Sequence, residues 1–520
     1  MTTVFTIVAI VGVVIATAAQ SLRWLRVLQR EHYEPASLLR FLKRWSSPPV
    51  GGARPVDRKA PRPITLTHVC LVVAVASVAL HQIPLLVATS IVYGLFCPTG
   101  LSVRGRTSAL VWTRRLRMVA AGSVLGAALL GALSLLLPSP LSWECAALIV
   151  WMVPLCLDLS SRALAPFERR NAQRFVDTAA ERLRRVHPRV VAITGSYGKT
   201  STKNHLADLF REDGGVVATP KSFNNRAGLS RAINEGLSDG TRVFIAEMGT
   251  YGPGEIAELC AWCPPSLSIV TAIGPVHLER MGSLDVIESA KFEITERADT
   301  VILNTDDERL ATWPAKLTGK RIRRAGSQRD ADVRVVVEGP AWHVDVDGRR
   351  VASVDALASL QPTNVACALA AALELGLTID QIAARLQALQ PVANRATVVT
   401  APSGVVVIDD TFNANPASAA ASLRLLTSLQ VTGRRVVVTP GMIELGDEQY
   451  RENARFARLV ADQRVELVVV NRTNVPALRD GYDSPLRRFN HRDDAVAWVR
   501  SSLRAGDAVL YLNDLPDHYP

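Results

Sequence analysis

Cysteine pairs of the kind that bind metals or form disulfides are scarce in this chain of 520 residues. Its seven cysteines are Cys70, Cys97, Cys145, Cys156, Cys260, Cys263 and Cys367. The first four fall in or beside apolar segments, and the Cys260-x-x-Cys263 spacing has no second Cys or His pair near it. We therefore expect buried thiols in a reduced compartment, without a zinc or redox centre. A Ser-His-Asp or Cys-His arrangement is also missing, so a side-chain nucleophile is not expected.

Acidic residues are too few to balance the basic ones. The chain has 48 Asp and Glu against 59 Lys and Arg, which gives a net charge of +11. Such an excess can indicate a nucleic-acid partner. Here much of it lies in the first third of the chain, between long apolar runs, where basic loops orient membrane helices. We therefore expect membrane lipids, and no nucleic acid, among the partners.

Long apolar runs are, by contrast, abundant near the N-terminus. They cover residues 4–19, 66–80, 83–96, 118–137 and 143–157. The first run is about the minimum length for crossing a bilayer. No basic residue precedes it and arginines follow it, which favours an uncleaved anchor over a signal peptide. The second and third runs are short, and are either two tilted helices or one helical hairpin. The prediction is about five transmembrane helices, with three or four as alternatives.

The connections between these runs differ in charge. Residues 20–65, 97–117 and the stretch after 157 are rich in arginine, whereas 81–82 and 137–142 have no Lys or Arg. Since basic segments face the cytoplasm, the N-terminus is expected outside and everything beyond Ser160 inside. This predicts a multi-pass protein of the cytoplasmic membrane, with the rest of the chain beyond Ser160 in the cytoplasm. Residues 22–44 are either an interfacial helix or a solvated linker, and residues 46–63 are expected to be irregular.

From residue 165 onward helix and strand patterns alternate, which is typical of a parallel α/β sheet. Strands are predicted at 189–194, 242–246, 267–272, 301–304, 404–408, 435–438, 466–470 and 508–512, with a small antiparallel hairpin at 333–351. Helices are predicted at 175–187, 204–210 and 364–375. The predicted fold is therefore α/β. It has a P-loop central domain with a parallel sheet (161–393) and a Rossmann-like C-terminal α/β domain (394–520), preceded by an α-helical transmembrane region (1–160).

A glycine-rich loop follows the strand at 189–194. The general Walker A pattern requires a Gly where Ile193 stands, and the chain has the shorter Thr-Gly-x-x-Gly-Lys-Thr-Ser instead. A strand, a glycine turn and a helix N-terminus together present several backbone N–H groups to one anion. Lys199 adds a positive charge for the β- and γ-phosphates, and the Thr200 hydroxyl can ligate Mg²⁺. The predicted ATP-binding residues here are Gly195, Ser196, Tyr197, Gly198, Lys199, Thr200 and Ser201. The alternative is a glycine turn with a surface lysine.

Further motifs follow the loop in order. Glu247-Met248-Gly249 ends the second strand, His277 follows the third, and Ser289-Ala290-Lys291-Phe292-Glu293 comes next. An acid at such a strand end can reach a phosphate-bound Mg²⁺. Together with the loop, this order resembles the Mur ligases, which join amino acids to cell-wall precursors. The resemblance covers roughly residues 190–375 and continues beyond them.

The resemblance implies roles for individual residues. The implied metal set is Thr200, Glu247, His277 and Lys291. Lys291 matches a lysine that the family carries as a carbamate, an anionic oxygen ligand that suits a second Mg²⁺. Asn224 and Asn225 lie in a stretch similar to the family's loop near the acceptor substrate. The alternatives are a helix-surface position for Lys291, a core or turn position for His277, and a polar turn without a binding role for Asn224 and Asn225.

The C-terminal domain continues the resemblance. Asn394-Arg395 and the run Asp-Asp-x-x-Asn-x-Asn-Pro from residue 409 are very like the family. The match implies that Arg395 contacts the terminal phosphate and Asp410 the ribose hydroxyls, and Asn364 stands where the family has an asparagine associated with adenine. The chain departs from the family at 360–363, which lack Gly-x-His. It also departs at 440–441, where Pro-Gly replaces Gly-Asp, and at 511–514, which replace a Lys-Gly-Ser-Arg-like end.

These features predict an ATP-dependent carboxylate–amine ligase of cell-envelope synthesis that acts through an acyl phosphate. The implied catalytic residues are Lys199, His277, Lys291 and Arg395, and the implied cofactors are ATP and two Mg²⁺, with Lys291 carbamylated. The family normally has a UDP-sugar-binding domain where this chain has apolar runs. The acid is therefore expected to be a lipid-linked or polymeric envelope precursor, and the amine an amino acid or short peptide. The alternatives are a poly-γ-glutamate-type polymerase and a membrane scaffold that binds nucleotide without ligating.

Overall fold

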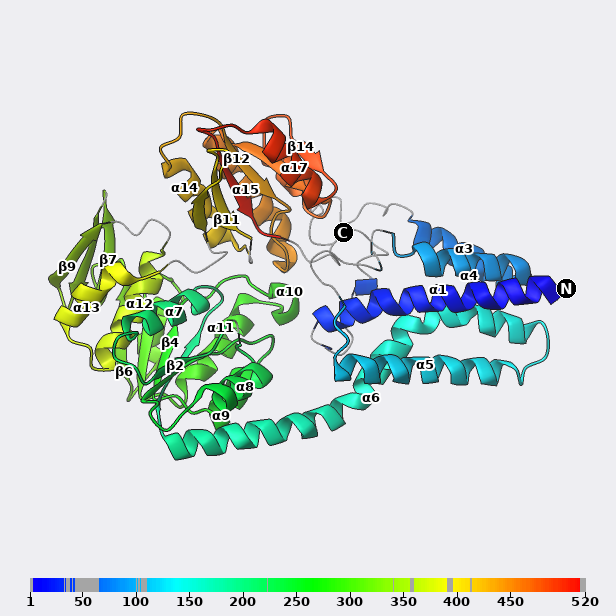
Figure 1. Ribbon diagram of the computed structural model, residues 1–520, viewed down its shortest axis with the longest axis horizontal. Coiled ribbons are helices and arrows are strands. Elements are labelled where there is room, and N and C mark those ends of the chain that lie inside the picture. Colours follow the sequence, from blue (N-terminus) through cyan, green and yellow to red (C-terminus); the bar gives the residue numbers. More distant parts are fainter. Residues whose placement is uncertain are drawn as a thin grey trace. The chain divides into compact units, whose positions relative to one another are not determined.

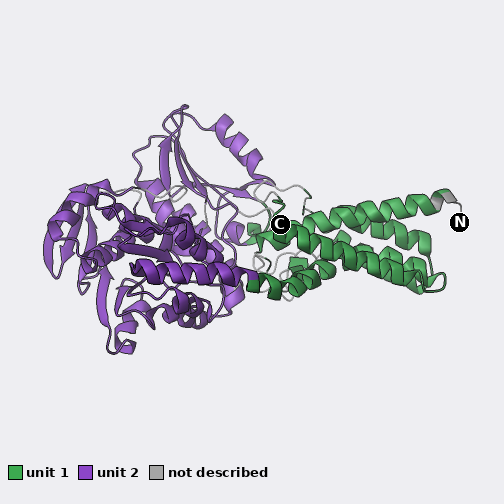
Figure 2. Cartoon of the chain, turned by 60° about the horizontal axis from the view of Figure 1, so that its bottom comes forward, with its two compact units in different colours: residues 1–170, 471–476, 515–520 green, residues 171–470, 477–514 purple. Residues whose placement is uncertain are grey.

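The computed structural model describes residues 3–31, 33, 38–39, 41–42, 65–99, 101, 103, 110–221, 223–339, 341–355, 360–390, 396–411 and 414–514. The chain forms two compact units (Figure 2): residues 1–170 with 471–476 and 515–520, and residues 171–470 with 477–514. The segment 46–63, predicted to be irregular, and Arg395 lie outside the described residues.

The first unit is built from helices (Figure 1). They are α1 (Thr3–Arg30), α3 (Leu66–Ala79), α4 (Ile83–Phe96), α5 (Arg114–Ser134) and the first part of α6 (Leu141–Val186). Three of them, α1, α5 and α6, are long and apolar enough to cross a membrane, while α3 and α4 are shorter apolar helices. With 14 residues each, α3 and α4 span only about 21 Å. They form a helical hairpin that turns at His81 and Gln82.

The basic end of α1 packs inside this unit. Residues 22–30 continue α1 without a break, so this part of 22–44 is neither a separate interfacial helix nor a solvated linker. Gln20 Nε2 donates to the carbonyls of Tyr93 and Cys97, at 3.1 and 2.7 Å. Arg23 donates to the carbonyls of Gly94 and Leu95. The last carbonyls of a helix have no partner within it, so these two side chains satisfy the end of α4.

α6 is one continuous helix of 46 residues. The sequence predicted a final span at 143–157 and a separate charged helix at 175–187. That division is wrong, because the backbone stays helical through Pro154 and Pro166. Only His187 and Pro188 separate the end of α6 from the first strand of the second unit.

A nine-stranded sheet organises the central part of the second unit. Its strands are β1 (Arg189–Thr194), β2 (Val216–Ala218), β3 (Val243–Glu247), β4 (Leu267–Val270), β5 (Thr300–Asn304), β6 (Arg321–Gly326), β7 (Val333–Glu338), β8 (Ala341–Val346) and β9 (Arg349–Asp355). They lie in the order β2-β3-β1-β4-β5-β6-β7-β8-β9, parallel from β2 to β7. The predicted antiparallel hairpin with its turn at residues 347–348 is present as β8 and β9. The sequence did not predict that β7, which pairs with both β6 and β8, joins this hairpin to the main sheet.

Two apolar layers cover this sheet. In β1, Val191 and Ile193 face one core, which α12 (Pro362–Glu374) and α7 (Lys199–Leu209) complete. Val190 and Ala192 face the other core, formed with the end of α6 and with α8 (Arg226–Gly236), α9 (Glu255–Trp262) and α11 (Leu284–Phe292). This alternation is the period of two that a strand covered on both faces requires. Because the strand order reverses beside β1, the loops after β1, β3 and β4 meet at one edge, where such sheets bind ligands.

The C-terminal part of the second unit is a second α/β layer. Its strands are β10 (Thr397–Thr400), β11 (Val406–Asp410), β12 (Arg435–Thr439), β13 (Glu466–Val470), β14 (Arg487–Phe489) and β15 (Ala508–Leu512), in the order β10-β11-β15-β12-β13-β14. All neighbours are parallel except β10 and β11. Its helices are α14 (Pro416–Ser428), α15 (Gln449–Asp462), α16 (Val475–Asp480) and α17 (Arg492–Ser502). The four predicted strands are present, and the mixed α/β class with parallel-rich sheets is confirmed.

Candidate active site

The glycine loop after β1 is held in a conformation that only glycine accommodates. Gly195 and Gly198 have φ angles of 152° and 86°. A Cβ on Gly195 would collide with the Thr271 hydroxyl, and one on Gly198 with the Asn364 side chain. α7 begins at Lys199, and its Nζ folds back to donate to the Gly195 carbonyl at 2.6 Å. The loop thus places a helix N-terminus and a lysine at one point, as anion binding requires.

A buried carboxylate lies next to this loop. Glu247 ends β3, which pairs with β1, and only 1% of it is exposed. The Thr200 hydroxyl donates to Glu247 Oε2 at 2.9 Å, and Asn224 Nδ2 donates to Glu247 Oε1 at 3.2 Å. The Lys203 ammonium stands 3.4 Å from Oε2, and burial lowers the pKa of Lys203 despite this carboxylate.

These oxygen ligands fit Mg²⁺. Magnesium is usually held by one or two protein oxygens, with phosphate and water completing its octahedron. The Thr200 hydroxyl and the Glu247 carboxylate supply such oxygens beside the phosphate loop. Within the described ranges, no group of three or more His, Cys, Asp or Glu side chains is placed to hold a metal ion. The arrangement therefore suits a nucleotide-bound Mg²⁺ better than a metal held by protein side chains alone.

One pocket brings together residues from five predicted stretches: the glycine loop, the Asn224 loop, Glu247-Met248-Gly249, His277 and the Lys291 stretch. It is lined by Gly195, Ser196, Lys199, Asn224, Gly249, Thr250, Tyr251, Val276, His277, Met281, Ile287 and Lys291. Lys291, on α11, is buried. Burial, followed by the charge of Lys199, drives the pKa of Lys291 well below its usual value. A lysine so placed favours its neutral amine, the form that reacts with carbon dioxide. We call this the reaction pocket.

His277, which borders the reaction pocket, contacts the C-terminal part of the unit. Its Nδ1 lies 2.6 Å from Oε2 of Glu444, which is in the loop after β12. The Tyr251 ring meets the His277 ring edge-on, with centroids 4.8 Å apart. The Arg280 guanidinium lies over the same tyrosine, 4.8 Å from its centroid. His277 is thus held by Glu444 and Tyr251, which come from two different loops, and Arg280 of the short helix α10 (Leu278–Met281) covers the tyrosine.

A second pocket, which we call the nucleotide pocket, lies on the other side of the glycine loop. It is lined by Tyr197, Gly198, Ser201, His205, Thr271, Asn304, Leu360, Gln361, Thr363, Asn364, Ala396, Asp410, Asn415, Ala417, Ser418, Ala421, Ser422 and Arg424. Asp410 ends β11, and its carboxylate accepts from the Ser422 hydroxyl at 2.7 Å. The pocket thus combines Asn364 and Asp410, which come from the two halves of the unit, with the phosphate loop.

Some predicted residues are placed elsewhere. Arg395 lies outside the described residues, although its neighbour Ala396 lines the nucleotide pocket. Asn225 lines neither pocket, and its side-chain oxygen caps α8 by accepting from the Gly228 N–H at 2.9 Å. Its role as an acceptor-loop residue stays a prediction.

Sequence reasoning assigned no role to Lys203, His205 or Glu444. Lys203 is four residues beyond Lys199, and no local pattern indicates that it is buried against Glu247. His205 is buried on α7, and burial lowers its pKa to about 4. Glu444 lies in the stretch Met442-Ile443-Glu444-Leu445-Gly446, and its partner His277 is 167 residues away.

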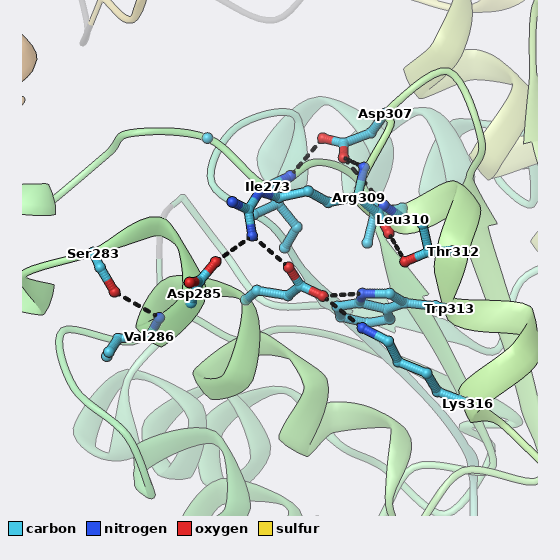
Figure 3. Close-up of polar contacts among 12 residues, drawn as sticks. Ile273, Ser283, Asp285, Val286, Asp307, Arg309, Leu310, Thr312, Trp313 and Lys316 are labelled. Carbon is cyan, nitrogen blue, oxygen red and sulfur yellow. Dashed lines mark hydrogen bonds and ion pairs between the residues drawn. The ribbon is translucent and has the colours of Figure 1, made fainter.

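A polar network behind the reaction pocket supports α11 and the loop before His277 (Figure 3). Glu288 of α11 accepts from Arg309 at 2.7 Å, Trp313 at 2.9 Å and Lys316 at 3.0 Å. Asp307 accepts from the backbone N–H of Ile273 at 2.8 Å. The network therefore ties the segments that carry Lys291 and His277 to the stretch after β5.

Comparison with known proteins matches two regions of the chain to models of one family. The family model described as Mur ligase middle domain matches residues 193–372, and the one described as Mur ligase, glutamate ligase domain matches residues 394–512. The UDP-N-acetylmuramoyl-tripeptide–D-alanyl-D-alanine ligase of Mycobacterium tuberculosis (strain ATCC 25618 / H37Rv) is 34% identical over 355 residues, which cover 62% of this chain and 69% of that protein. The Bacillus subtilis (strain 168) protein of the same name is 25% identical over 338 residues, covering 63% of this chain and 74% of that protein.

Solved structures resemble the same part. MurF from Acinetobacter baumannii has a TM-score of 0.58 and 23% identity, covering 66% of this chain and 77% of that one. MurF ligase from Thermotoga maritima in complex with ADP has the same score and identity, covering 66% of this chain and 80% of that one. At this identity the likeness is one of fold.

Proposed function

This chain belongs to the Mur ligase family, and from that premise we propose that it is a membrane-anchored member acting on a lipid-linked or polymeric substrate. Mur ligases are ATP-dependent amide-bond ligases that use ATP and Mg²⁺, and the resemblance to them predicted from the sequence is confirmed. The chain is a MurF-like ligase of peptidoglycan precursor synthesis.

One observation carries the assignment of chemistry to residues. Lys199 lines the reaction pocket with His277 and Lys291, while the neighbouring Gly198 lines the nucleotide pocket with Asp410. A single nucleotide on the loop can therefore place its terminal phosphate in the first pocket and its nucleoside in the second. A scaffold that only bound nucleotide would not need a buried lysine beside the phosphate.

The chemistry follows from the poor reactivity of a carboxylate. The carboxylate of the acid attacks the terminal phosphorus of ATP, which gives an acyl phosphate and ADP. The nitrogen of the amine then attacks the acyl carbon, the C–O bond to phosphate breaks, and the amine loses a proton. The products are an amide and inorganic phosphate. Lys199 offsets the charge that develops on the transferring phosphoryl group, and Arg395 is proposed to do the same from the C-terminal domain.

Thr200 and Glu247 would hold a nucleotide-bound Mg²⁺. A bound Mg²⁺ would supply positive charge that neutralises the phosphates during transfer. We propose that Lys291 carries a carbamate, formed when its neutral amine adds to carbon dioxide and releases a proton. The carbamate would supply an anionic oxygen beside His277 for a second Mg²⁺.

The membrane part of the proposal rests on the N-terminal helices. α1, α5 and α6 are long and apolar enough to span a bilayer. The connections between the apolar runs alternate between arginine-rich segments and segments without Lys or Arg. α6 leads to the strand of the phosphate loop with only two residues between. A ligase attached to the bilayer in this way would meet substrates that are themselves attached to it, and its catalytic domains would lie in the cytoplasm. The acid would carry the precursor's carboxylate, and the amine would be an amino acid or short peptide.

The test is ATP-dependent phosphate release by the full-length protein in lipid nanodiscs. Soluble UDP-muramoyl peptides and lipid-linked precursors would be offered as acids, with a panel of amino acids and dipeptides. We expect release only with a matched pair, and faster release with the lipid-linked acid. Lys199→Ala should reduce it by about 10²–10³-fold, whereas Lys320→Ala, on a lysine remote from both pockets, should not. Phosphate release unchanged by Lys199→Ala would refute the ligase assignment. A ladder of products would favour the polymerase alternative.

A further inference from the structure

The contact between His277 and Glu444 joins the two halves of the second unit. His277 follows β4 and Glu444 follows β12, and Nδ1 and Oε2 are 2.6 Å apart. Both residues have positive φ angles, 58° and 63°, which non-glycine residues seldom adopt. Such backbone conformations persist only where the surroundings hold them, and they cluster at functional sites.

The hydrogen bond determines which nitrogen of His277 carries a proton. An ionised carboxylate can only accept, so Nδ1 of His277 must donate to Glu444. In the neutral ring, Nε2 then keeps its lone pair and can accept a proton or bind a cation. Without Glu444 the neutral ring could carry its proton on either nitrogen.

The loop that carries Glu444 is itself firmly anchored. Asn453 of α15 is buried and accepts from the Met442 N–H at 2.8 Å while donating to the Met442 carbonyl at 2.9 Å. Asn513 donates to the Gly441 carbonyl at 2.7 Å. Leu445 is buried directly after Glu444. The carboxylate is therefore presented by a fixed loop.

We propose that Glu444 is a positioning residue that fixes the tautomer and orientation of His277, so that the metal site of the central domain is complete only when the C-terminal domain is docked. The inference rests on the proposed function for the role of His277. Metal-binding histidines commonly donate their second nitrogen to a carboxylate, and losing that carboxylate weakens metal binding by about 10–100-fold. The acid comes here from the other half of the unit, so domain docking and metal binding assist each other.

A simpler explanation is an ordinary partly exposed ion pair. Side chains of His277 and Glu444 are 26% and 25% exposed, and a pair of this kind contributes little to stability. The two explanations differ in what they predict for cation affinity, because a merely structural pair would leave the metal site unchanged.

The test measures Mn²⁺ affinity by electron paramagnetic resonance, with ADP bound to the full-length protein and no substrate present. Glu444→Ala should weaken Mn²⁺ binding by roughly tenfold or more, while metal-free ADP affinity stays unchanged. Glu444→Gln keeps an oxygen that can accept from Nδ1, so it should lose less. The matched control is Glu448→Gln, a nearby acid that pairs with Arg451.

A double-mutant comparison separates positioning from damage to the fold. If Glu444 acts through His277, Glu444→Ala should add little to the loss caused by His277→Ala. Equal Mn²⁺ affinity in Glu444→Ala and the parent, or fully additive losses, would overturn the proposal. Because this readout needs no acid or amine, it decides the role of Glu444 even if the proposed ligation fails.

Discussion

At the scale of single residues, the site depends on how one buried carboxylate is satisfied. Glu247 accepts from Thr200 and Asn224, its backbone N–H donates to the Thr219 hydroxyl, and Lys203 stands beside it. A buried charge is costly unless it is paired and hydrogen-bonded. Lys203 therefore places a compensating positive charge 3.4 Å from the carboxylate that would receive Mg²⁺.

Replacing Lys203 by Met should destabilise the strand and helix that meet at this point. Removing one partner of a buried ion pair typically costs about 3–5 kcal/mol, because the other charge is left unpaired. We expect faster hydrogen exchange in β3 and α7, which measures the free energy of opening. Adding Glu247→Gln removes the unpaired buried charge and should restore part of the protection against hydrogen exchange. If hydrogen exchange in β3 and α7 is the same in Lys203→Met as in the parent, the ion pair does not stabilise the fold.

His205 should make stability depend on pH in a defined window. Burial lowers its pKa from 6.5 to about 4 in the folded state. As pH falls below 6.5, the unfolded chain binds a proton at this ring and the folded protein does not. The stability contributed by the neutral ring is therefore complete above pH 6.5 and is lost as pH falls toward 4, by about 3 kcal/mol. As pH falls through this range, the thermal unfolding midpoint of the parent should fall relative to that of His205→Leu. Midpoints that change with pH by the same amount in both proteins would contradict this prediction.

At the scale of elements, α11 is tied to the stretch after β5 by Glu288, a partly buried acceptor for Arg309, Trp313 and Lys316. Figure 3 labels these three donors. Glu288→Ala removes the acceptor of Trp313 and Lys316 and one of the two acceptors of Arg309, which also donates to Asp285. Each lost hydrogen bond to a charged group is worth about 1.5–3 kcal/mol. We expect faster hydrogen exchange in α11. Since Lys291 is on that helix and is proposed to carry a carbamate, carbon dioxide should also stimulate phosphate release less than in the parent. The control is Asp285→Ala, because Asp285 pairs with the same Arg309 but its side chain is 84% exposed. Equal effects of the two variants would refute the role of Glu288.

The elements also show how far local pattern predicts this structure. Short apolar runs bounded by turns identified β1, β3, β4, β5 and four strands of the C-terminal layer, because buried parallel strands look alike wherever they occur. The sequence pattern did not predict that β7 pairs with β6, since the sequence of one strand does not specify which strand it pairs with. It also divided α6, because a change from apolar to charged residues leaves the backbone helical.

The candidate site was predictable to the extent that its residues are in local motifs. The glycine loop, Lys199, His277 and Lys291 each stand in a short recognisable stretch, and the structure places these lysines and this histidine in one pocket. The contact between the Glu444 carboxylate and His277 could not be predicted, because it exists only after the two sheets have folded and packed.

At the scale of the whole molecule, α6 runs from the first unit into the second. It begins among apolar residues, continues through arginines and ends two residues before the phosphate-loop strand. The proposed lipid-linked substrate requires that this helix enters the cytoplasm at its C-terminal end. That requirement makes membrane topology the decisive property of the chain.

Reporter fusions in a bacterial host test this topology. Residues 137–142 have no Lys or Arg, while Arg162, Arg169, Arg170 and Arg174 follow the last apolar run, so the positive-inside rule places the first stretch outside and the second inside. Alkaline phosphatase, which folds only outside the cytoplasm, should be active when fused after Pro138 and inactive after Arg170. Green fluorescent protein, which fluoresces only inside, should give the opposite result. Phosphatase activity after Arg170 would place the phosphate loop where ATP is absent, and the proposal of a membrane-anchored ligase would fail with it.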